Sequence, residues 1–227
     1  MSQTWGLIFD VDGVIADSES VNVRATMAAF AEVLGMSGMR VEDFEAGIGR
    51  GAAAYVSAGA DAHGRTLESE EVDRLVLRRQ ETFLSLLAEE TLPAYPGVRE
   101  LMHSALADDD WRLAIATSST RDKSQAVLEA AGIPWADMAR LCGDDVTHAK
   151  PDPELFSLAC GRLQLTPGSC VVIEDSPVGV EAAQAAGCSC VAVTNTHTRE
   201  RLQRADLTVE TLVEVTLDTL RGLLQGP

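Results

Sequence analysis

Basic residues are few in this chain. The 227 residues contain 18 Lys and Arg against 35 Asp and Glu, which gives a formal net charge of −17. Such a charge repels nucleic acid and anionic membranes, so neither is an expected partner. No apolar run approaches the roughly 20 residues that span a membrane, and the N-terminus lacks the pattern of a signal peptide. We therefore expect a cytoplasmic protein, monomeric or weakly dimeric.

The spacing of the cysteines disfavours a zinc centre. The cysteines are odd in number and scattered, and the close pair Cys188 and Cys190 lacks a CxxC partner. We expect small core residues or surface thiols instead of metal ligands. The whole set is Cys142, Cys160, Cys170, Cys188 and Cys190.

Short apolar strands alternate with helices over the second half of the chain. Strands are predicted at residues 112–116, 170–173 and 189–194. One helix is predicted over 123–131 with Gly132 as its C-cap, and another begins at Pro177 after the N-cap Ser176. With 46% apolar residues, the chain can bury a sizeable core. The alternation predicts an α/β fold, a doubly wound, Rossmann-like parallel sheet with helices on both faces.

The segment after the first strand has a helical periodicity instead. No β-branched run interrupts it between about residues 21 and 92, and several apolar side chains fall on one face of a helix. They are Val72, Leu75, Val76, Phe83, Leu86 and Leu87. We predict a helical cap domain over 19–92, inserted into a core domain formed by 1–18 and 93–227. Two hinges would let such an insertion open and close over the sheet edge.

Two aspartates, Asp10 and Asp12, directly follow the apolar strand near the start of the chain. Side chains at positions i and i+2 leave a strand on the same side. Two carboxylates so close can both stay ionised only near a cation, and open α/β sheets bind ligands at the carboxyl ends of their strands. The pair therefore indicates either a solvated turn or a divalent-metal site that holds a nucleophile and an acid/base.

Three later segments accompany this pair, each at or near the end of a predicted strand. Thr117 closes the strand 112–116, Lys150 stands in an Ala-Lys-Pro-Asp segment, and Glu174-Asp175-Ser176 follows the strand 170–173. With residues 10–19, these four motifs resemble the haloacid dehalogenase superfamily over the whole chain. The insertion after the first motif is similar to that of the subfamily of beta-phosphoglucomutase and related sugar-phosphate phosphatases.

The resemblance implies a catalytic role for four residues. Asp10 is the implied nucleophile, which takes the phosphoryl group as an aspartyl-phosphate. Asp12 is the implied general acid and base, first for the leaving oxygen and then for the attacking water. Thr117 donates a hydrogen bond to a phosphoryl oxygen, and Lys150 supplies a point charge there.

The resemblance also implies a magnesium cofactor, since hard carboxylate oxygens and a phosphate group suit this ion. Its implied ligands are Asp10, the backbone carbonyl of Asp12, and Asp175. Glu174 is implied to act through water. These four residues form the candidate metal set.

Substrate selection is implied to lie in the cap. Arg50 stands where the mutase carries an arginine for the distal phosphate, and a solvated residue at a helix start is the alternative. Arg79 lies near the apolar face of the long cap helix and either reaches the cleft or stays at the surface. Ser118, beside Thr117, and Asn22, at the position of the mutase's histidine, complete the candidate substrate-binding residues.

Departures from the mutase pattern favour a phosphatase. Asn22 replaces the histidine, and Thr120 or Arg121 stands where a lysine is expected. We expect Mg²⁺-dependent hydrolysis of a small phosphorylated metabolite, by resemblance a sugar phosphate. A phosphosugar mutase is one alternative and a non-catalytic phospholigand-binding protein another. The second carboxylate, Asp12, disfavours a dehalogenase, and the lack of lysine between Asp12 and Arg121 disfavours a phosphonatase.

Overall fold

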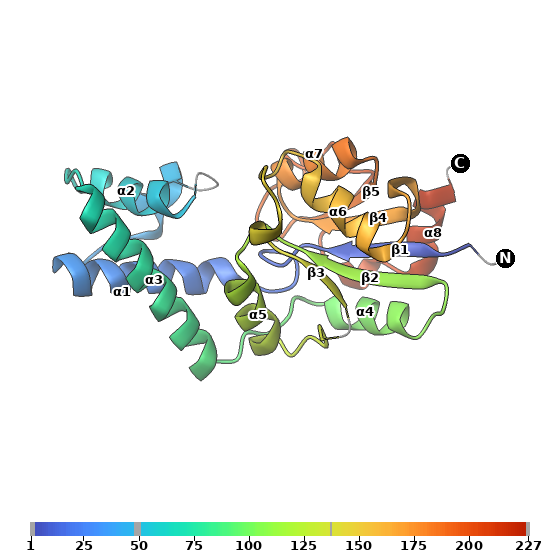
Figure 1. Cartoon of the computed structure of the whole chain (residues 1–227), viewed down its shortest axis with the longest axis horizontal. Helices are drawn as coiled ribbons and strands as arrows, with labels where there is room; N and C mark the ends of the chain where they lie inside the picture. The colour runs from blue at the N-terminus through green and yellow to red at the C-terminus, as the bar shows by residue number, and fades with distance from the viewer. Residues whose placement is uncertain (1–2, 48–50, 137, 226–227) are drawn as a thin grey trace. The chain divides into compact units, whose positions relative to one another are not determined.

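The computed structural model describes residues 3–47, 51–136 and 138–225. The chain divides into two compact units, Met1–Asp17 with Leu92–Pro227 and Ser18–Thr91. The first unit contains a β-sheet, and the second is built of helices (Figure 1). In the ranges that the structure describes, no helix combines the length and the apolar character needed to cross a membrane.

Within the residues that the structure describes, the sheet of the first unit has six parallel strands in the order β3-β2-β1-β4-β5-β6. The strands are β1 Trp5–Phe9, β2 Trp111–Ala116, β3 Ala139–Leu141, β4 Cys170–Glu174, β5 Ser189–Val193 and β6 Leu207–Val209. The predicted parallel α/β fold is confirmed, and β2, β4 and β5 lie within one residue of their predicted bounds. Strands β3 and β6, with three residues each, were not predicted.

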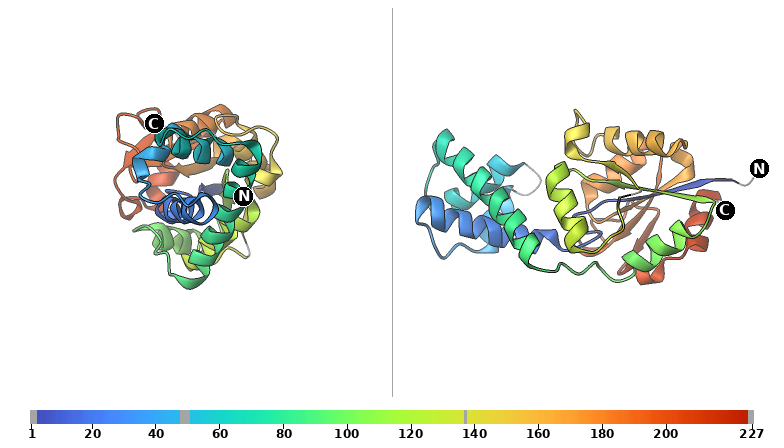
Figure 2. Two further views of the ribbon diagram at one scale, coloured as in Figure 1. Left: turned by 90° about the vertical axis from the view of Figure 1, so that its left-hand side faces the viewer. Right: turned by 60° about the horizontal axis from the view of Figure 1, so that its bottom comes forward.

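Helices cover both faces of this sheet, as Figure 2 shows. On one face, α6 and α7 pack against alternate strand residues such as Ile8, Ala114 and Val172. On the other face lie α4 and α8, which pack against β2 and β4. The helices are α4 Val98–Leu106, α5 Arg121–Ala130, α6 Glu154–Leu163, α7 Pro177–Ala186 and α8 Leu217–Gln225.

The ends of two helices follow from local sequence. At the start of α7, Ser176 accepts a hydrogen bond from the Gly179 amide at 3.1 Å, and Pro177 occupies the first helical position, as predicted. Helix α5 ends at Ala130, so its predicted range was one residue too long at this end. Gly132 follows with a φ of +62°, a conformation that favours glycine.

The cysteines belong to the core. All five are buried and free, which confirms the interpretation of small core residues and excludes that of surface thiols.

In its described residues, the second unit consists of three α-helices and a 3-10 helix: α1 Ser18–Leu34, the 3-10 helix Val41–Gly47, α2 Ala52–Ala62 and α3 Ser69–Glu89. Helix α3 turns its predicted apolar face inward, with Leu75, Phe83 and Leu87 buried. The core of the unit includes Phe44, which stacks on Tyr55 with ring centroids 5.2 Å apart. The helical character predicted for this segment is therefore confirmed.

The register of the sheet brings the ends of its central strands to one level. Phe9 of β1 pairs with Ile115 of β2 and with Ile173 of β4. The Asp10 amide continues the ladder by donating to the Ile173 carbonyl at 3.1 Å. The polar residues that follow β1, β2 and β4 consequently meet at the carboxyl edge, where parallel α/β sheets bind their ligands.

Candidate active site

Lys150 joins the first and last motifs at this edge. Its Nζ lies 2.8 Å from Oδ1 of Asp10 and 2.6 Å from Oε1 of Glu174. The three side chains are almost completely buried, with exposed fractions of 7% for Lys150, 8% for Asp10 and 1% for Glu174. The loop that precedes α6 carries the lysine, and the strand ends carry the two carboxylates. The chain contains only one other lysine, Lys123.

Burial and charge act against each other in this cluster. Burial raises the pKa of Asp10, the Lys150 ammonium lowers it, and the Glu174 and Asp12 carboxylates raise it again, so that it reaches about 7. Burial lowers the pKa of Lys150, but Asp10 and Glu174 outweigh this effect and raise it above its ordinary value. Burial, Glu174 and Asp10 all raise the pKa of Asp175.

Glu174 holds the loop that begins α7. Its Oε2 accepts hydrogen bonds from the Asp175 amide at 2.8 Å, the Ser176 amide at 3.0 Å and Ser176 Oγ at 2.9 Å. These donors and Lys150 outweigh burial and lower the pKa of Glu174, so it stays charged. A Cβ on Gly179 would lie 1.8 Å from Glu174 Oε1, so only glycine fits there. The bonds favour a positioning role for Glu174 over direct metal coordination.

Asp12 is fixed by the loop after β2. Ser119 Oγ donates to Asp12 Oδ2 at 2.6 Å, and Thr117 Oγ1 donates to the same oxygen at 3.4 Å. The Ser119 amide donates to Thr117 Oγ1 at 3.1 Å, which fixes the threonine as well. Ser119 was not among the predicted site residues, although it stands two residues after Thr117 in a polar loop. Ser118, which was predicted to bind substrate, is exposed.

Gly13 lets the first and fourth motifs approach each other. It has a φ of +78°, and a Cβ there would lie 2.0 Å from Asp175 Oδ2. Its carbonyl accepts a hydrogen bond from Asn195 Nδ2 at 2.8 Å. Thr196 Oγ1 donates to Asp175 Oδ2 and lies 3.2 Å from the Asp175 carbonyl oxygen. Neither Asn195 nor Thr196 was predicted from the sequence.

Magnesium fits this set of donors. Four carboxylates, from Asp10, Asp12, Glu174 and Asp175, gather near a single ammonium, that of Lys150. Their oxygens are the hard ligands that Mg²⁺ prefers, and burial raises the cost of the excess negative charge. A divalent cation would favour the ionised forms of Asp10 and Asp175, whose pKa values are raised.

The helical unit contains a polar cluster of its own, which includes two predicted residues. Arg79 Nη2 donates to Asn22 Oδ1 at 2.6 Å, and Asn22 Nδ2 donates to Glu19 Oε2 at 3.1 Å. Tyr55 Oη donates to Glu19 Oε1 at 2.9 Å, and the Arg79 guanidinium lies 4.8 Å from the Tyr55 ring centroid. Burial lowers the pKa of Arg79. Arg50 lies outside the described residues.

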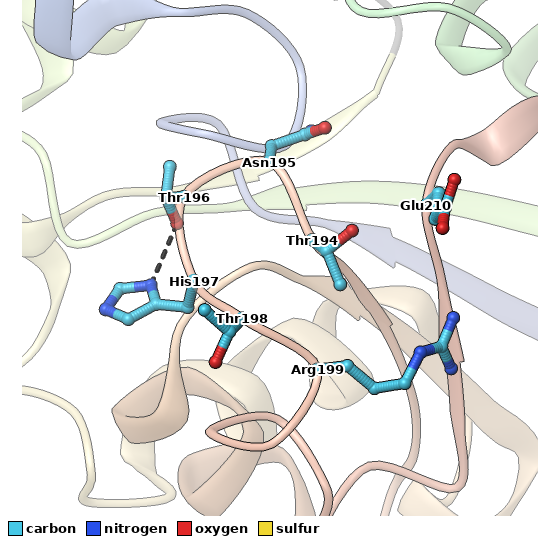
Figure 3. A pocket seen from close by; sticks show the side chains of 7 residues that line it. All are labelled: Thr194, Asn195, Thr196, His197, Thr198, Arg199 and Glu210. Atoms are coloured by element: carbon cyan, nitrogen blue, oxygen red, sulfur yellow. Dashed lines mark hydrogen bonds between the residues drawn. The ribbon is translucent and has the colours of Figure 1, made fainter.

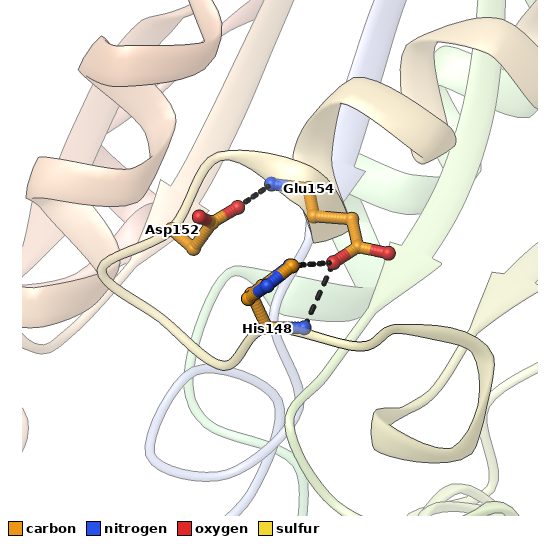
Figure 4. A group of neighbouring side chains, drawn as sticks. All are labelled: His148, Asp152 and Glu154. Atoms are coloured by element: carbon orange, nitrogen blue, oxygen red, sulfur yellow. Dashed lines mark hydrogen bonds and ion pairs between the residues drawn. The ribbon is translucent and has the colours of Figure 1, made fainter.

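His148, Asp152 and Glu154 form a second group of side chains of the kinds that bind metal ions (Figure 4). They lie in and after the loop that carries Lys150 and stabilise it through hydrogen bonds. Glu154 Oε2 accepts from the His148 amide at 2.8 Å and lies 3.0 Å from His148 Nδ1. Asp152 Oδ1 accepts from the Glu154 amide at 2.9 Å. The two carboxylates are therefore used to fasten the loop to the start of α6.

The fold and this site define an α/β protein with a polar, acidic centre at the carboxyl edge and an inserted helical unit. A model of the haloacid dehalogenase-like hydrolases matches residues 6–187. The chain belongs to this family and is a hydrolase, so the family identified from the four motifs is confirmed.

Several characterised proteins are similar over nearly the whole chain. Validoxylamine A 7'-phosphate phosphatase of Streptomyces hygroscopicus subsp. limoneus is 33% identical over 216 residues, which cover 92% of this chain and 94% of that protein. Hexitol phosphatase A of Escherichia coli (strain K12) is 30% identical over 213 residues, 93% of each chain. A crystal structure of mutant CbbY from Rhodobacter sphaeroides in complex with xylulose-(1,5)bisphosphate superimposes with a TM-score of 0.83 at 27% identity, covering 96% of this chain and 99% of that one.

Proposed function

We propose that this protein is a Mg²⁺-dependent phosphatase that hydrolyses a small sugar phosphate through an aspartyl-phosphate on Asp10. The observation that carries the proposal is the buried bridge from Lys150 Nζ to Asp10 Oδ1, 2.8 Å, and to Glu174 Oε1, 2.6 Å. The bridge supports the proposal because a buried carboxylate and a buried ammonium lie together at the carboxyl edge of the sheet, where parallel α/β sheets bind their ligands. The relatives named as phosphatases support the same reaction class.

The proposed reaction has two displacements at phosphorus. In the first, an Asp10 carboxylate oxygen bonds to phosphorus while the bond to the sugar oxygen breaks, and protonated Asp12 gives its proton to that oxygen. In the second, Asp12 takes a proton from water as the water oxygen bonds to phosphorus. The bond to Asp10 then breaks, which releases phosphate and restores both aspartates.

Phosphoryl transfer depends mainly on positioning and on neutralising the charge of the phosphoryl oxygens. Thr117 and Lys150 are the proposed protein donors to these oxygens. When bound, Mg²⁺ would supply further neutralisation of the same charge, and Asp10, Asp175 and the Asp12 carbonyl are its proposed ligands. Glu174 is proposed to hold Lys150 and the loop of Asp175 in place.

The helical unit is proposed to recognise the sugar. Its cluster offers a carboxylate, an amide, a phenol and a guanidinium, from Glu19, Asn22, Tyr55 and Arg79. Such groups donate to and accept from hydroxyls, and a guanidinium also binds a carboxylate or a phosphate. Arg50 and Ser118 remain further proposed substrate contacts.

The test is phosphate release from a panel of phosphorylated metabolites with MgCl₂, in the wild type and in Asp10→Asn. The panel contains hexose, pentose and triose phosphates, phosphoglycolate and nucleoside monophosphates. We expect release from at least one sugar phosphate and a loss of at least about 10³-fold in kcat in Asp10→Asn. Circular dichroism and thermal unfolding of the variant show that its fold is retained.

Three results would contradict this proposal. Activity that survives Asp10→Asn would remove Asp10 from the nucleophilic role. Activity that persists in EDTA would show that the reaction does not depend on a metal. Isomerisation of beta-glucose 1-phosphate without phosphate release would establish a mutase instead.

A further inference from the structure

A loop after β5, residues 194–199, reaches back to the candidate metal site. It lines a pocket of about 410 Å³ together with Glu210 (Figure 3). Its first residues follow a strand that pairs with β4, because Ile173 and Glu174 lie opposite Val191 and Ala192. The sheet therefore brings this loop beside Asp175, and no motif described so far includes it.

Two side chains of the loop bind two different motifs. Asn195 Nδ2 donates to the Gly13 carbonyl at 2.8 Å, directly after Asp12. Thr196 Oγ1 donates to Oδ2 of the Asp175 carboxylate. The loop thus contacts both segments that supply the proposed ligands.

Both contacts depend on a hydrogen-bond donor in the loop, the Asn195 amide and the Thr196 hydroxyl. Thr196 is exposed as a whole residue, so its hydroxyl contributes little to the core. His197 Nδ1 lies 2.9 Å from Thr196 Oγ1 (Figure 3). It also lies 3.1 Å from the Asp175 carbonyl oxygen, which adds a third contact. In the part of the chain that the structure describes, no side chain besides Thr196 donates to the carboxylate of Asp175.

We propose that Asn195 and Thr196 are positioning residues for the divalent-metal site. Thr196 fixes the rotamer of the Asp175 carboxylate, and Asn195 fixes the backbone that follows Asp12. Hydrogen-bond partners behind a metal ligand orient it, and their loss commonly weakens metal binding by about 10- to 100-fold. The proposal rests on the metal site of the proposed function, but not on the identity of the substrate.

A pair of substitutions separates the hydroxyl from the rest of the Thr196 side chain. Thr196→Val keeps both branches at Cβ, including the methyl that lies near Gly13, and removes only the donor. Thr196→Ser keeps the donor and removes the methyl. Thr198→Val is the matched control, because Thr198 is also exposed in this loop and its side chain bonds Glu200 instead of Asp175.

The experiment measures Mg²⁺ binding to the free, full-length protein by calorimetry, with Mn²⁺ as a second probe. We expect the Kd for Mg²⁺ to rise about 10-fold or more in Thr196→Val and in Asn195→Ala. It should stay within about twofold of the wild type in Thr196→Ser and Thr198→Val. The Mg²⁺ concentration that gives half-maximal phosphate release should shift in parallel, while kcat at saturating Mg²⁺ changes little.

An unchanged Kd in folded Thr196→Val and Asn195→Ala would overturn the proposal, and so would an equal loss in Thr196→Ser and Thr196→Val. Thermal unfolding without metal checks the fold of each variant, and Thr196→Ala replaces Thr196→Val if that variant does not fold. Because the readout is metal binding, a wild type that binds Mg²⁺ but releases no phosphate contradicts only the proposed function. A wild type that does not bind Mg²⁺ contradicts both.

Discussion

Lys150 and Glu174 form an ion pair, with Nζ 2.6 Å from Oε1, that is almost completely removed from solvent. A buried charge that loses its partner is strongly destabilising, usually by about 3–5 kcal/mol. In Glu174→Ala, however, Lys150 keeps Asp10 as a partner at 2.8 Å. This variant should therefore lower the free energy of unfolding by less, by about 1–3 kcal/mol from buried donors that lose their acceptor, measured by urea denaturation. The loop of Asp175 and Ser176 would lose its acceptor in the same variant.

Glu181→Ala is the control for this first prediction. Glu181 pairs with Arg204 at 3.4 Å, but its side chain is 49% exposed. Exposed pairs contribute less than about 1 kcal/mol, so this variant should unfold almost as the wild type does. If both substitutions lowered the free energy of unfolding equally, the buried Lys150–Glu174 pair would contribute no more to stability than an exposed pair.

The stability of the metal-free protein should fall as the pH rises from about 5 to 7. Asp10 has a pKa of about 7 in the folded protein and an ordinary value near 3.8 in the unfolded chain. In this interval the folded state therefore holds a proton that the unfolded state has released, so stability decreases with pH and levels off above 7. The raised pKa of Asp175 acts in the same direction.

Urea denaturation in EDTA at several pH values measures this slope, which for one group is at most about 1.4 kcal/mol per pH unit. Asp10→Asn removes one titrating group and should flatten the slope. His197 has a lowered pKa and acts in the opposite direction, but it is present in both proteins. The same slope in Asp10→Asn and the wild type would contradict the prediction.

Ser119→Ala should lower kcat by about tenfold or more and leave KM nearly unchanged. The reason is that Ser119 Oγ, 2.6 Å from Asp12 Oδ2, orients the proposed acid and base. Ser119→Thr keeps the hydroxyl and should restore most of the rate. Ser104→Ala is the control, because Ser104 is exposed and its Oγ donates to the Glu100 carbonyl within α4. The pH profile of kcat should change in Ser119→Ala and in neither of the other two variants. If Ser119→Ala had the rate and the pH profile of the wild type, Ser119 would not orient Asp12.

The central part of the site could be predicted because it follows strands with clear patterns. Asp10, Thr117 and Glu174 each end an apolar run, and parallel strands place such ends at one edge. Lys150 lies in the loop before α6 and does not itself end a strand, so its role at the site could be predicted only from the family resemblance. The contact spans 140 positions of the chain, which no local pattern encodes.

Ser119, Asn195 and Thr196 were missed for a related reason. Each lies in a polar loop whose composition is that of an ordinary turn, and each acts through a partner more than 20 positions away. Strands β3 and β6 were missed because three residues are too few to show a periodicity. A signal for Ser119 existed in its alternation with Thr117, since residues two apart leave an extended segment on the same side.

Arg79→Met should raise KM for the best substrate by about tenfold while kcat changes less. Arg79 donates to Asn22 at 2.6 Å and lies over the Tyr55 ring, so methionine keeps part of the packing and removes the charge and the donors. Arg78→Met is the matched control on the same helix. Arg78 forms exposed ion pairs with Glu32 and Glu81 and should change neither constant. Steady-state kinetics on the best substrate of the panel measure KM and kcat in the two variants. If KM were the same in Arg79→Met and Arg78→Met, the polar cluster of the helical unit would have no part in substrate recognition.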